Sequence, residues 1–458
     1  MSRSRAGKKI LSYVIFHRHG QRAPTKNIYE ASHTVPHHAP HLPLAEADTW
    51  QELLASPHEL ESLQELYPVD RHPDRGLQTD LNTKPFGCIT SSGLENLEHQ
   101  GRETLRAFPA LGRAQSLEVY STNYQRTQVS AQAFLKGLEV PAGTKVKVLA
   151  SEDCPLSFYD HDPVLAVKLT KQVQNTPNFQ QEEEDFVASH GGVLLDAVPE
   201  LGSIRDVFTF NVPLDDSLSD AAGGIDVEKA NPREQKRQRG GERAKRVNWM
   251  AALDYFSCRG AHELPVHPEL DGSDIGHRMK EYVGSRFKLY YADEDFRRVA
   301  VLPMLKNVIV KEFSRRLGLS RDALDKGDQS PTVVIYSGHD VNLLGLLVTL
   351  NASLVHSDSS HWPDYGASIV FELVYDGGEK ASRDRGGGGD SDSDGVQEPS
   401  AEDCAVNVYY NQQPLSIHLP PDNASTSHIH PSEAGDSVSH SMKLSELINY
   451  CENLARPW

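Results

Sequence analysis

A strand-like run near the start of the chain ends in a histidine flanked by arginines. Residues 14–24 read Val-Ile-Phe-His-Arg-His-Gly-Gln-Arg-Ala-Pro, which puts His19 between Arg18 and Arg22. A neutral imidazole can attack phosphorus and carry the phosphoryl group as a covalent intermediate. The guanidinium groups beside it can hold phosphate oxygens through paired hydrogen bonds, and Gly20 lets the backbone approach a bulky anion. The stretch favours phosphate chemistry at a histidine, with a basic turn and a chance histidine as the structural alternative.

Two further segments place polar residues just past predicted strands. Arg126 follows the strand-like run 117–120 and begins a helix, and His339 and Asp340 follow the β-branched run 332–336. Ligand sites in open α/β sheets collect at the carboxyl ends of strands. Taken singly, Asp340 has a structural explanation as a helix N-cap, His339 as a packed turn histidine and Arg126 as a member of a surface ion pair. Taken together these explanations are poor, because all three residues follow strand ends.

The segments together resemble the histidine acid phosphatase family, the branch of the histidine phosphatase superfamily with an RHGxRxP signature and a late His-Asp pair. The signature is matched by Arg18, His19, Gly20, Arg22 and Pro24. Further family elements are matched by residues 89–93, by Ser121, Thr122, Arg126, Thr127, Ser130 and Ala131, and by Trp362, Pro363 and Tyr365, with Gly366 inserted before Ala367. Residues from about 160 to 300 carry little similarity.

This resemblance implies roles for six residues. His19 would be the nucleophile that forms a phosphohistidine, and Asp340 would protonate the leaving alcohol. Phosphate would be bound by Arg18, Arg22, Arg126 and His339. The chemistry of the groups agrees, because three arginines can neutralise the transferring group without a metal, and a carboxyl group can donate and later accept a proton. We expect no metal and no cofactor, and we interpret His17 as a packing residue.

The order of predicted elements indicates an α/β fold with a mostly parallel central sheet flanked by helices and an inserted, largely helical cap. Helices are predicted over residues 45–54, 91–108, 125–138, 296–317 and 443–454, and strands over 10–16, 117–121, 145–149, 332–336, 368–375 and 405–411. The expected core is discontinuous and comprises residues 1–25, 86–154 and 296–458, with cap regions at 26–85 and 155–295. Residues 376–403, rich in glycine, serine and aspartate, are predicted to be a disordered loop.

Composition narrows the classes of partner. The chain has 458 residues and a formal net charge of −18, which argues against binding nucleic acid or an anionic membrane as its main task. No run approaches the ~20 apolar residues that span a membrane, and no secretory signal is visible. The five cysteines are scattered without metal-binding spacing, as in a reduced protein. We therefore expect a cytoplasmic protein that takes a phosphorylated small molecule or a lysolipid, and the sequence leaves its oligomeric state open.

Three other segments invite a functional interpretation. The basic run 233–246 could be a localisation signal or attract anions, although a solvated loop is the simpler explanation. His33, His37, His38 and His41 match no structural zinc spacing, and prolines interrupt any helix that would align them. Residues 160–162, Asp-His-Asp, are a weak candidate for lining the substrate pocket.

The sequence therefore predicts an acid phosphatase that hydrolyses phosphate monoesters through a phosphohistidine. Activity should favour mildly acidic pH, because Asp340 must hold a proton while His19 is neutral. The order of elements looks closest to the lysophosphatidic acid phosphatase type. The alternatives are an inositol phosphate phosphatase, a phosphomutase of the same superfamily, and a non-catalytic protein that binds phosphorylated ligands or acts as a scaffold.

Overall fold

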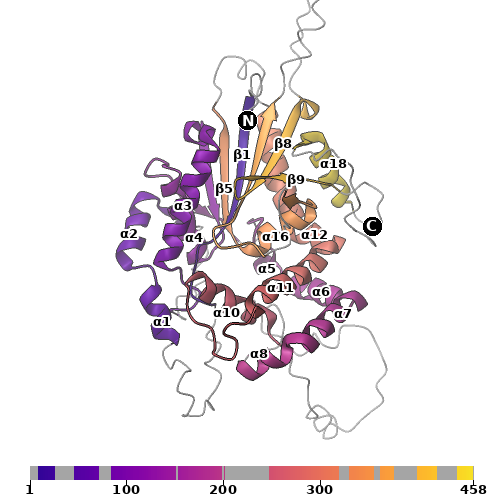
Figure 1. Ribbon diagram of the computed structural model, residues 1–458. Coiled ribbons are helices and arrows are strands. Elements are labelled where there is room, and N and C mark those ends of the chain that lie inside the picture. Colours follow the sequence, from indigo (N-terminus) through magenta and orange to yellow (C-terminus); the bar gives the residue numbers. More distant parts are fainter. Residues whose placement is uncertain are drawn as a thin grey trace, which may run out of the picture. The chain divides into compact units, whose positions relative to one another are not determined.

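A ten-stranded mixed sheet is the framework of the computed structural model (Figure 1). The strand order is β2-β4-β3-β5-β1-β7-β8-β9-β6, and β10 pairs with β8. The structure describes residues 9–25, 46–71, 84–150, 153–198, 201, 247–318, 330–354, 362–375, 400–419 and 441–456.

One half of the sheet is parallel and contains the chain's first strand. It comprises β1 (Lys9–Arg18), β5 (Thr332–Gly338), β3 (Ser116–Ser121), β4 (Val146–Val148) and β2 (Val69–Arg71). β1 lies between β5, its parallel partner, and β7, its antiparallel partner. Every residue from Leu11 to Arg18 is buried, as expected for an apolar strand covered on both faces. The carboxyl ends of β1, β5 and β3 therefore meet at one edge of the sheet.

The other half is antiparallel. It comprises β7 (Ser368–Tyr375), β8 (Cys404–Tyr410), β9 (Gln413–Ser416), β6 (Ser353–Leu354) and β10 (Ser441–Lys443). β7 and β8, which were both predicted as strands, form an antiparallel pair. Helices cover both faces of the sheet, so the α/β class with flanking helices is confirmed.

Two helices that pack against each other on one face of the sheet fix the position of residues 121–131. α3 (Ser91–Ala107) and α4 (Gln125–Gly137) lie side by side (Figure 1). Glycines permit this approach, because a Cβ on Gly101 would lie 2.3 Å from the Phe134 carbonyl oxygen and one on Gly137 would lie 2.0 Å from that of Glu98. The close contact fixes α4, whose first turn carries Arg126.

The remaining helices of this part of the chain include those predicted over residues 45–54 and 443–454, together with helices outside the predicted ranges, and one prediction needs correction. They are α1 (Glu46–Leu53), α2 (Pro57–Leu66), α5 (Phe158–His161), α16 (Asp340–Thr349) and α18 (Leu444–Leu454), with 3-10 turns at Pro109–Arg113 and Ala401–Asp403. The single helix predicted over 296–317 is instead α12 (Glu294–Ala300), α13 (Leu302–Met304), the π-helical turn Leu305–Val310 and α14 (Lys311–Leu317). Pro303 lacks a backbone N–H and interrupts the helical ladder at this point.

The described residues cluster into two units. The second unit lies within residues 162–283 and is helical, with α6 (Pro163–Gln174), α7 (Pro177–Phe186), the π-helical turn Val187–Gly191, α8 (Gly192–Ala197), α10 (Trp249–Ala261) and the start of α11 (Ile275–Ala292). Phe186, Trp249 and Tyr282 form its aromatic core, with the rings of Phe186 and Tyr282 stacked 4.0 Å apart.

The first unit contains the sheet and also residues 46–71, which the sequence analysis placed in the cap. The physical reason is that β2 pairs with β4, and Leu63 of α2 is buried in the hydrophobic core beside α4. The four-histidine cluster, the basic run 233–246 and residues 376–399 of the predicted loop lie outside the described residues. Within the described part, no helix combines the length and apolar character needed to cross a membrane.

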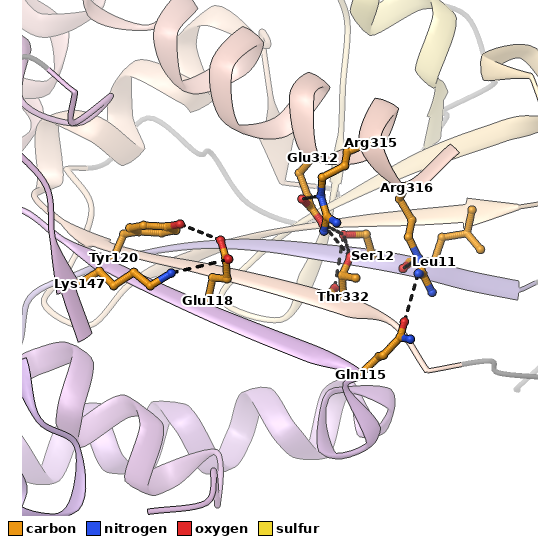
Figure 2. Close-up of polar contacts among 10 residues, drawn as sticks. All are labelled: Leu11, Ser12, Gln115, Glu118, Tyr120, Lys147, Glu312, Arg315, Arg316 and Thr332. Carbon is orange, nitrogen blue, oxygen red and sulfur yellow. Dashed lines mark hydrogen bonds and ion pairs between the residues drawn. The ribbon is translucent and has the colours of Figure 1, made fainter. Parts of the chain in front are cut away.

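A polar cluster lies at the amino ends of the parallel strands (Figure 2). Glu312 of α14 accepts a hydrogen bond of 2.7 Å from the Thr332 hydroxyl and pairs with Arg315 through both carboxylate oxygens. Arg316 donates to the Leu11 and Ser330 carbonyls and to Gln115. These contacts tie α14 to the first residues of β1 and β5.

Candidate active site

The loop after β1 is held from three directions. The His19 N–H donates to the Gly338 carbonyl (3.1 Å), the Gly20 N–H donates to Ser130 Oγ (3.0 Å), and the His19 carbonyl accepts from Gly366 N–H (3.1 Å). A Cβ on Gly20 would lie 2.4 Å from the Gly93 carbonyl oxygen. Gly20 is therefore required by the close approach of α3, a reason that the sequence analysis did not foresee.

His19 is buried and oriented. Its side chain is 2% exposed, and Nδ1 lies 2.9 Å from the Gly20 carbonyl oxygen. Because a carbonyl only accepts, this contact places the proton on Nδ1 and the lone pair on Nε2. Burial, followed by the positive charges of Arg22, Arg126 and Arg18, holds the pKa of His19 well below 6.5. The ring is therefore neutral at neutral and mildly acidic pH, which a nucleophile requires.

His339 stands beside His19 at the end of β5. The two ring centroids are 5.6 Å apart, edge to face, and His339 Nε2 lies 3.1 Å from Thr122 Oγ1. Its backbone N–H donates to the Asn342 side chain (2.9 Å), which fixes the start of α16. Burial, then the charges of Arg126, Arg22 and Arg18, also holds the pKa of His339 well below 6.5.

The three predicted phosphate-binding arginines surround this histidine pair. Arg18 is 3% exposed, Arg22 6% and Arg126 8%, so all three guanidinium groups lie inside the protein. The Cζ atom of Arg18 lies 4.0 Å from the centre of the Tyr365 ring, and that of Arg126 lies 4.3 Å from the Tyr124 ring. Gathering buried cations is unfavourable unless an anion balances them. The positive field at this edge of the sheet therefore suits a phosphate group.

Asp340 begins α16 and is the charged partner of Arg18. Its Oδ2 atom lies 2.7 Å from Arg18 Nη2 and accepts from Trp362 Nε1 (3.1 Å), while Oδ1 accepts from the Val341 N–H (2.9 Å). Its side chain is 17% exposed and is more accessible than that of Arg18, which is 4% exposed. The N-cap of α16 is His339, so Asp340 is not the N-cap that the sequence suggested. It lies in the first turn, where its carboxylate accepts from the Val341 N–H and pairs with Arg18.

All six residues named from the sequence lie together at the carboxyl ends of β1, β5 and β3. Four further contacts involve residues of the matched motifs to which the sequence analysis gave no role: Thr122, Ser130, Trp362 and Tyr365. Their place inside the motifs was the only sign in the sequence that these residues belong to the site. Which groups they contact is seen only in the structure.

Two other residues considered from the sequence have structural contacts of their own. His17 is fully buried and stacks on Phe134 with ring centroids 4.7 Å apart, as expected of a packing residue. Burial lowers the pKa of His17 to about 4. Asp162 caps α6 by accepting from the Leu165 N–H (2.9 Å), which gives it a structural function in the second unit.

Comparison with known proteins gives a family match for part of the chain and a fold match for nearly all of it. Residues 9–190 match the model of the histidine phosphatase superfamily (branch 2). The phytase of Klebsiella sp ASR1 superposes with a TM-score of 0.51 at 13% identity over 98% of each chain. The phytase of Hafnia alvei in its apo form gives 0.51 at 15% identity over 99% of each chain. A sequence comparison with curated proteins gives no match.

At these identities the likeness to phytases establishes the fold alone, and the family match over 9–190 supplies the class. Residues 9–190 of this chain are thus similar to the histidine phosphatase superfamily, branch 2, and this match supports a phosphoric monoester hydrolase.

Proposed function

We propose that the protein is an acid phosphatase that hydrolyses phosphate monoesters in two steps through a phosphohistidine on His19. The observation that carries this proposal is the orientation of the His19 ring. Its Nδ1 is hydrogen-bonded to the Gly20 carbonyl, which leaves the Nε2 lone pair to attack phosphorus. Arg18, Arg22 and Arg126 all contribute positive potential at this ring. A phosphate monoester is the small anion that matches both features.

In the first step Nε2 of His19 forms a bond to phosphorus while the bond to the leaving oxygen breaks. The leaving oxygen takes the electron pair of that bond and a proton from Asp340. Arg18, Arg22, Arg126 and His339 hold the three remaining phosphate oxygens, whose charge is spread in the transition state.

In the second step water attacks the phosphohistidine. Asp340, now a carboxylate, accepts a proton from the water as its oxygen bonds to phosphorus, and the nitrogen–phosphorus bond breaks. Phosphate leaves, and Asp340 again holds the proton used in the first step. No metal enters this scheme, because arginines supply the positive charge.

The pH dependence follows from the protonation states that the first step needs. His19 must be neutral, and its lowered pKa keeps it so through the mildly acidic range. Asp340 must hold a proton, so the rate with an alkyl phosphate should fall as the pH rises. The proposal therefore predicts an acidic optimum, measured from kcat/KM between about pH 4 and 9.

The test is capture of the phosphoenzyme. Wild type and His19→Ala are mixed with radiolabelled p-nitrophenyl phosphate and quenched in alkali, in which phosphohistidine survives and phosphoserine does not. Alkali-stable label on wild type, absent from His19→Ala together with turnover, is the expected result. Label that persists in His19→Ala, or turnover that a metal chelator abolishes, contradicts the proposal.

A substrate panel then separates the specificities that remain: lysophosphatidic acid, sugar phosphates and inositol hexakisphosphate. Preferred turnover of one class assigns the physiological leaving group. Binding of phosphate ligands without turnover of any ester would instead support the non-catalytic alternative.

A further inference from the structure

Residues 362–367, here called the clamp segment, touch both members of the Arg18–Asp340 pair. Trp362 Nε1 donates to Asp340 Oδ2 (3.1 Å), and the Pro363 carbonyl accepts from Arg18 Nη1 (2.5 Å). The ring of Tyr365 lies under the same guanidinium group at 4.0 Å. One short segment therefore orients the proposed acid and the arginine beside it.

The clamp segment is itself fixed at both ends. Trp362 is 3% exposed and meets the ring of Phe287 edge to face at 5.0 Å. Beyond it, Gly366 adopts a φ of 72°, and a Cβ there would lie 2.2 Å from Asn96 Oδ1. This inserted glycine makes the bend after Tyr365, and the Ala367 carbonyl then accepts from the Arg18 N–H (2.8 Å).

The contacts of Asp340 use its two oxygens unequally. Oδ2 faces two donors, Arg18 Nη2 at 2.7 Å and Trp362 Nε1 at 3.1 Å, whereas Oδ1 faces one, the Val341 N–H at 2.9 Å. A carboxylate oxygen has two lone pairs in the plane of the group. Both lone pairs of Oδ2 are therefore occupied, and one lone pair of Oδ1 remains for a proton.

We propose that Trp362 is a positioning residue for the general acid, which occupies Oδ2 and so directs the transferable proton of Asp340 to Oδ1. The inference rests on the proposed function. In the first step the O–H bond on Oδ1 breaks as the leaving oxygen takes that proton. In the second step the attacking water returns a proton to Oδ1. Trp362 forms and breaks no covalent bond.

The experiment compares two leaving groups in one enzyme. Nitrophenolate departs from p-nitrophenyl phosphate with little need of a proton, whereas the alkoxide of glycerol 2-phosphate requires one. In Trp362→Phe the indole N–H is lost while an aromatic ring remains against Phe287, so the proton can occupy either oxygen. We expect kcat/KM for glycerol 2-phosphate to fall about tenfold or more, and that for the aryl ester to fall much less.

The ratio of the two kcat/KM values is the readout, because it does not depend on how much of a preparation is folded. The matched control is Trp50→Phe, which removes another buried indole donor from a carboxylate, Glu46 Oε1 at 2.6 Å, in α1. Its ratio should equal that of wild type.

Several results would overturn the inference. Equal losses with both esters would make Trp362 a packing residue, and unchanged kcat/KM values for both esters would show that Asp340 needs no help from the indole. If wild type turns over neither ester, the proposed function is wrong, and this inference is wrong as well because it rests on that function. If wild type is active but Asp340→Asn loses both activities equally, the acid is misassigned.

Discussion

The two edges of the parallel half of the sheet both gather arginines and a carboxylate, but they use them differently. At the amino edge Glu312 accepts hydrogen bonds from the Thr332 hydroxyl and from two nitrogens of Arg315 (Figure 2). Arg316 donates to two backbone carbonyls and to the Gln115 side chain. At the carboxyl edge the arginines surround two histidines, and their charges lower the pKa of both rings.

The difference is one of electrostatic balance. At the amino edge the charged groups pair with one another and with protein groups that join α14 to β1 and β5, so these charges stabilise the fold. The carboxyl edge keeps a positive potential at His19, to which Arg22, Arg126, Arg18 and, when protonated, His339 contribute. Such a potential disfavours the empty state and favours one bound to an anion. We therefore expect substitutions at the carboxyl edge to change catalysis and those at the amino edge to change stability.

The largest effect should follow loss of Arg126. In Arg126→Ala we expect kcat/KM for p-nitrophenyl phosphate to fall about 10²- to 10³-fold, the usual result of removing one donor from a developing charge. Removing this cation also raises the pKa of His19, so the acid limb of the pH–rate profile should move to higher pH.

Arg315→Ala is the matched substitution at the amino edge. Its side chain is 57% exposed, so loss of its pair with Glu312 should change the free energy of unfolding by less than about 1 kcal/mol. Its kcat/KM per folded molecule should equal that of wild type. Comparable losses of activity in both variants would contradict the division between the edges.

An intermediate effect is expected from Glu312 itself. Glu312→Ala removes the 2.7 Å acceptor of the buried Thr332 hydroxyl, which retains Ser12 Oγ at 2.9 Å, and should lower the free energy of unfolding by about 1 kcal/mol. Glu312→Gln keeps an acceptor oxygen and should lose less. Urea unfolding measures both, and an activity loss in either variant that exceeds its loss of folded protein would show that the amino edge influences catalysis.

Sequence alone named the candidate residues at the carboxyl edge but few of the residues at the amino edge. His19, Arg126 and His339 could be named because each follows a β-branched or apolar run, and strand ends meet at one edge by topology. Glu312 and Arg316 gave no such signal, because they lie within a predicted helix and not just after a strand. Likewise Trp362 stood inside a recognised motif, but its hydrogen bond to Asp340 joins residues from two separate segments, and such a contact has no local pattern.

An effect that depends on pH concerns His17, which stands one residue before Arg18 at the carboxyl edge but packs in the core. Its pKa in the folded protein is about 4, against 6.5 for an exposed histidine. Between these values the unfolded chain binds a proton on His17 that the folded chain does not. The free energy of unfolding therefore falls as the pH is lowered from 6.5, by about 1.4 kcal/mol per pH unit from this residue.

His17→Leu removes that proton while an apolar side chain remains against Phe134. Its free energy of unfolding should depend less on pH than that of wild type. The unfolded histidine is already half protonated at pH 6.5, so the difference between the two proteins should change by about 1 kcal/mol from pH 6.5 to 5.5 in urea unfolding. His19 and His339 contribute equally to both proteins and cancel. Parallel curves for the two proteins would mean that His17 gains its proton in the folded state, and would place it with the solvated histidines of the chain rather than with the core.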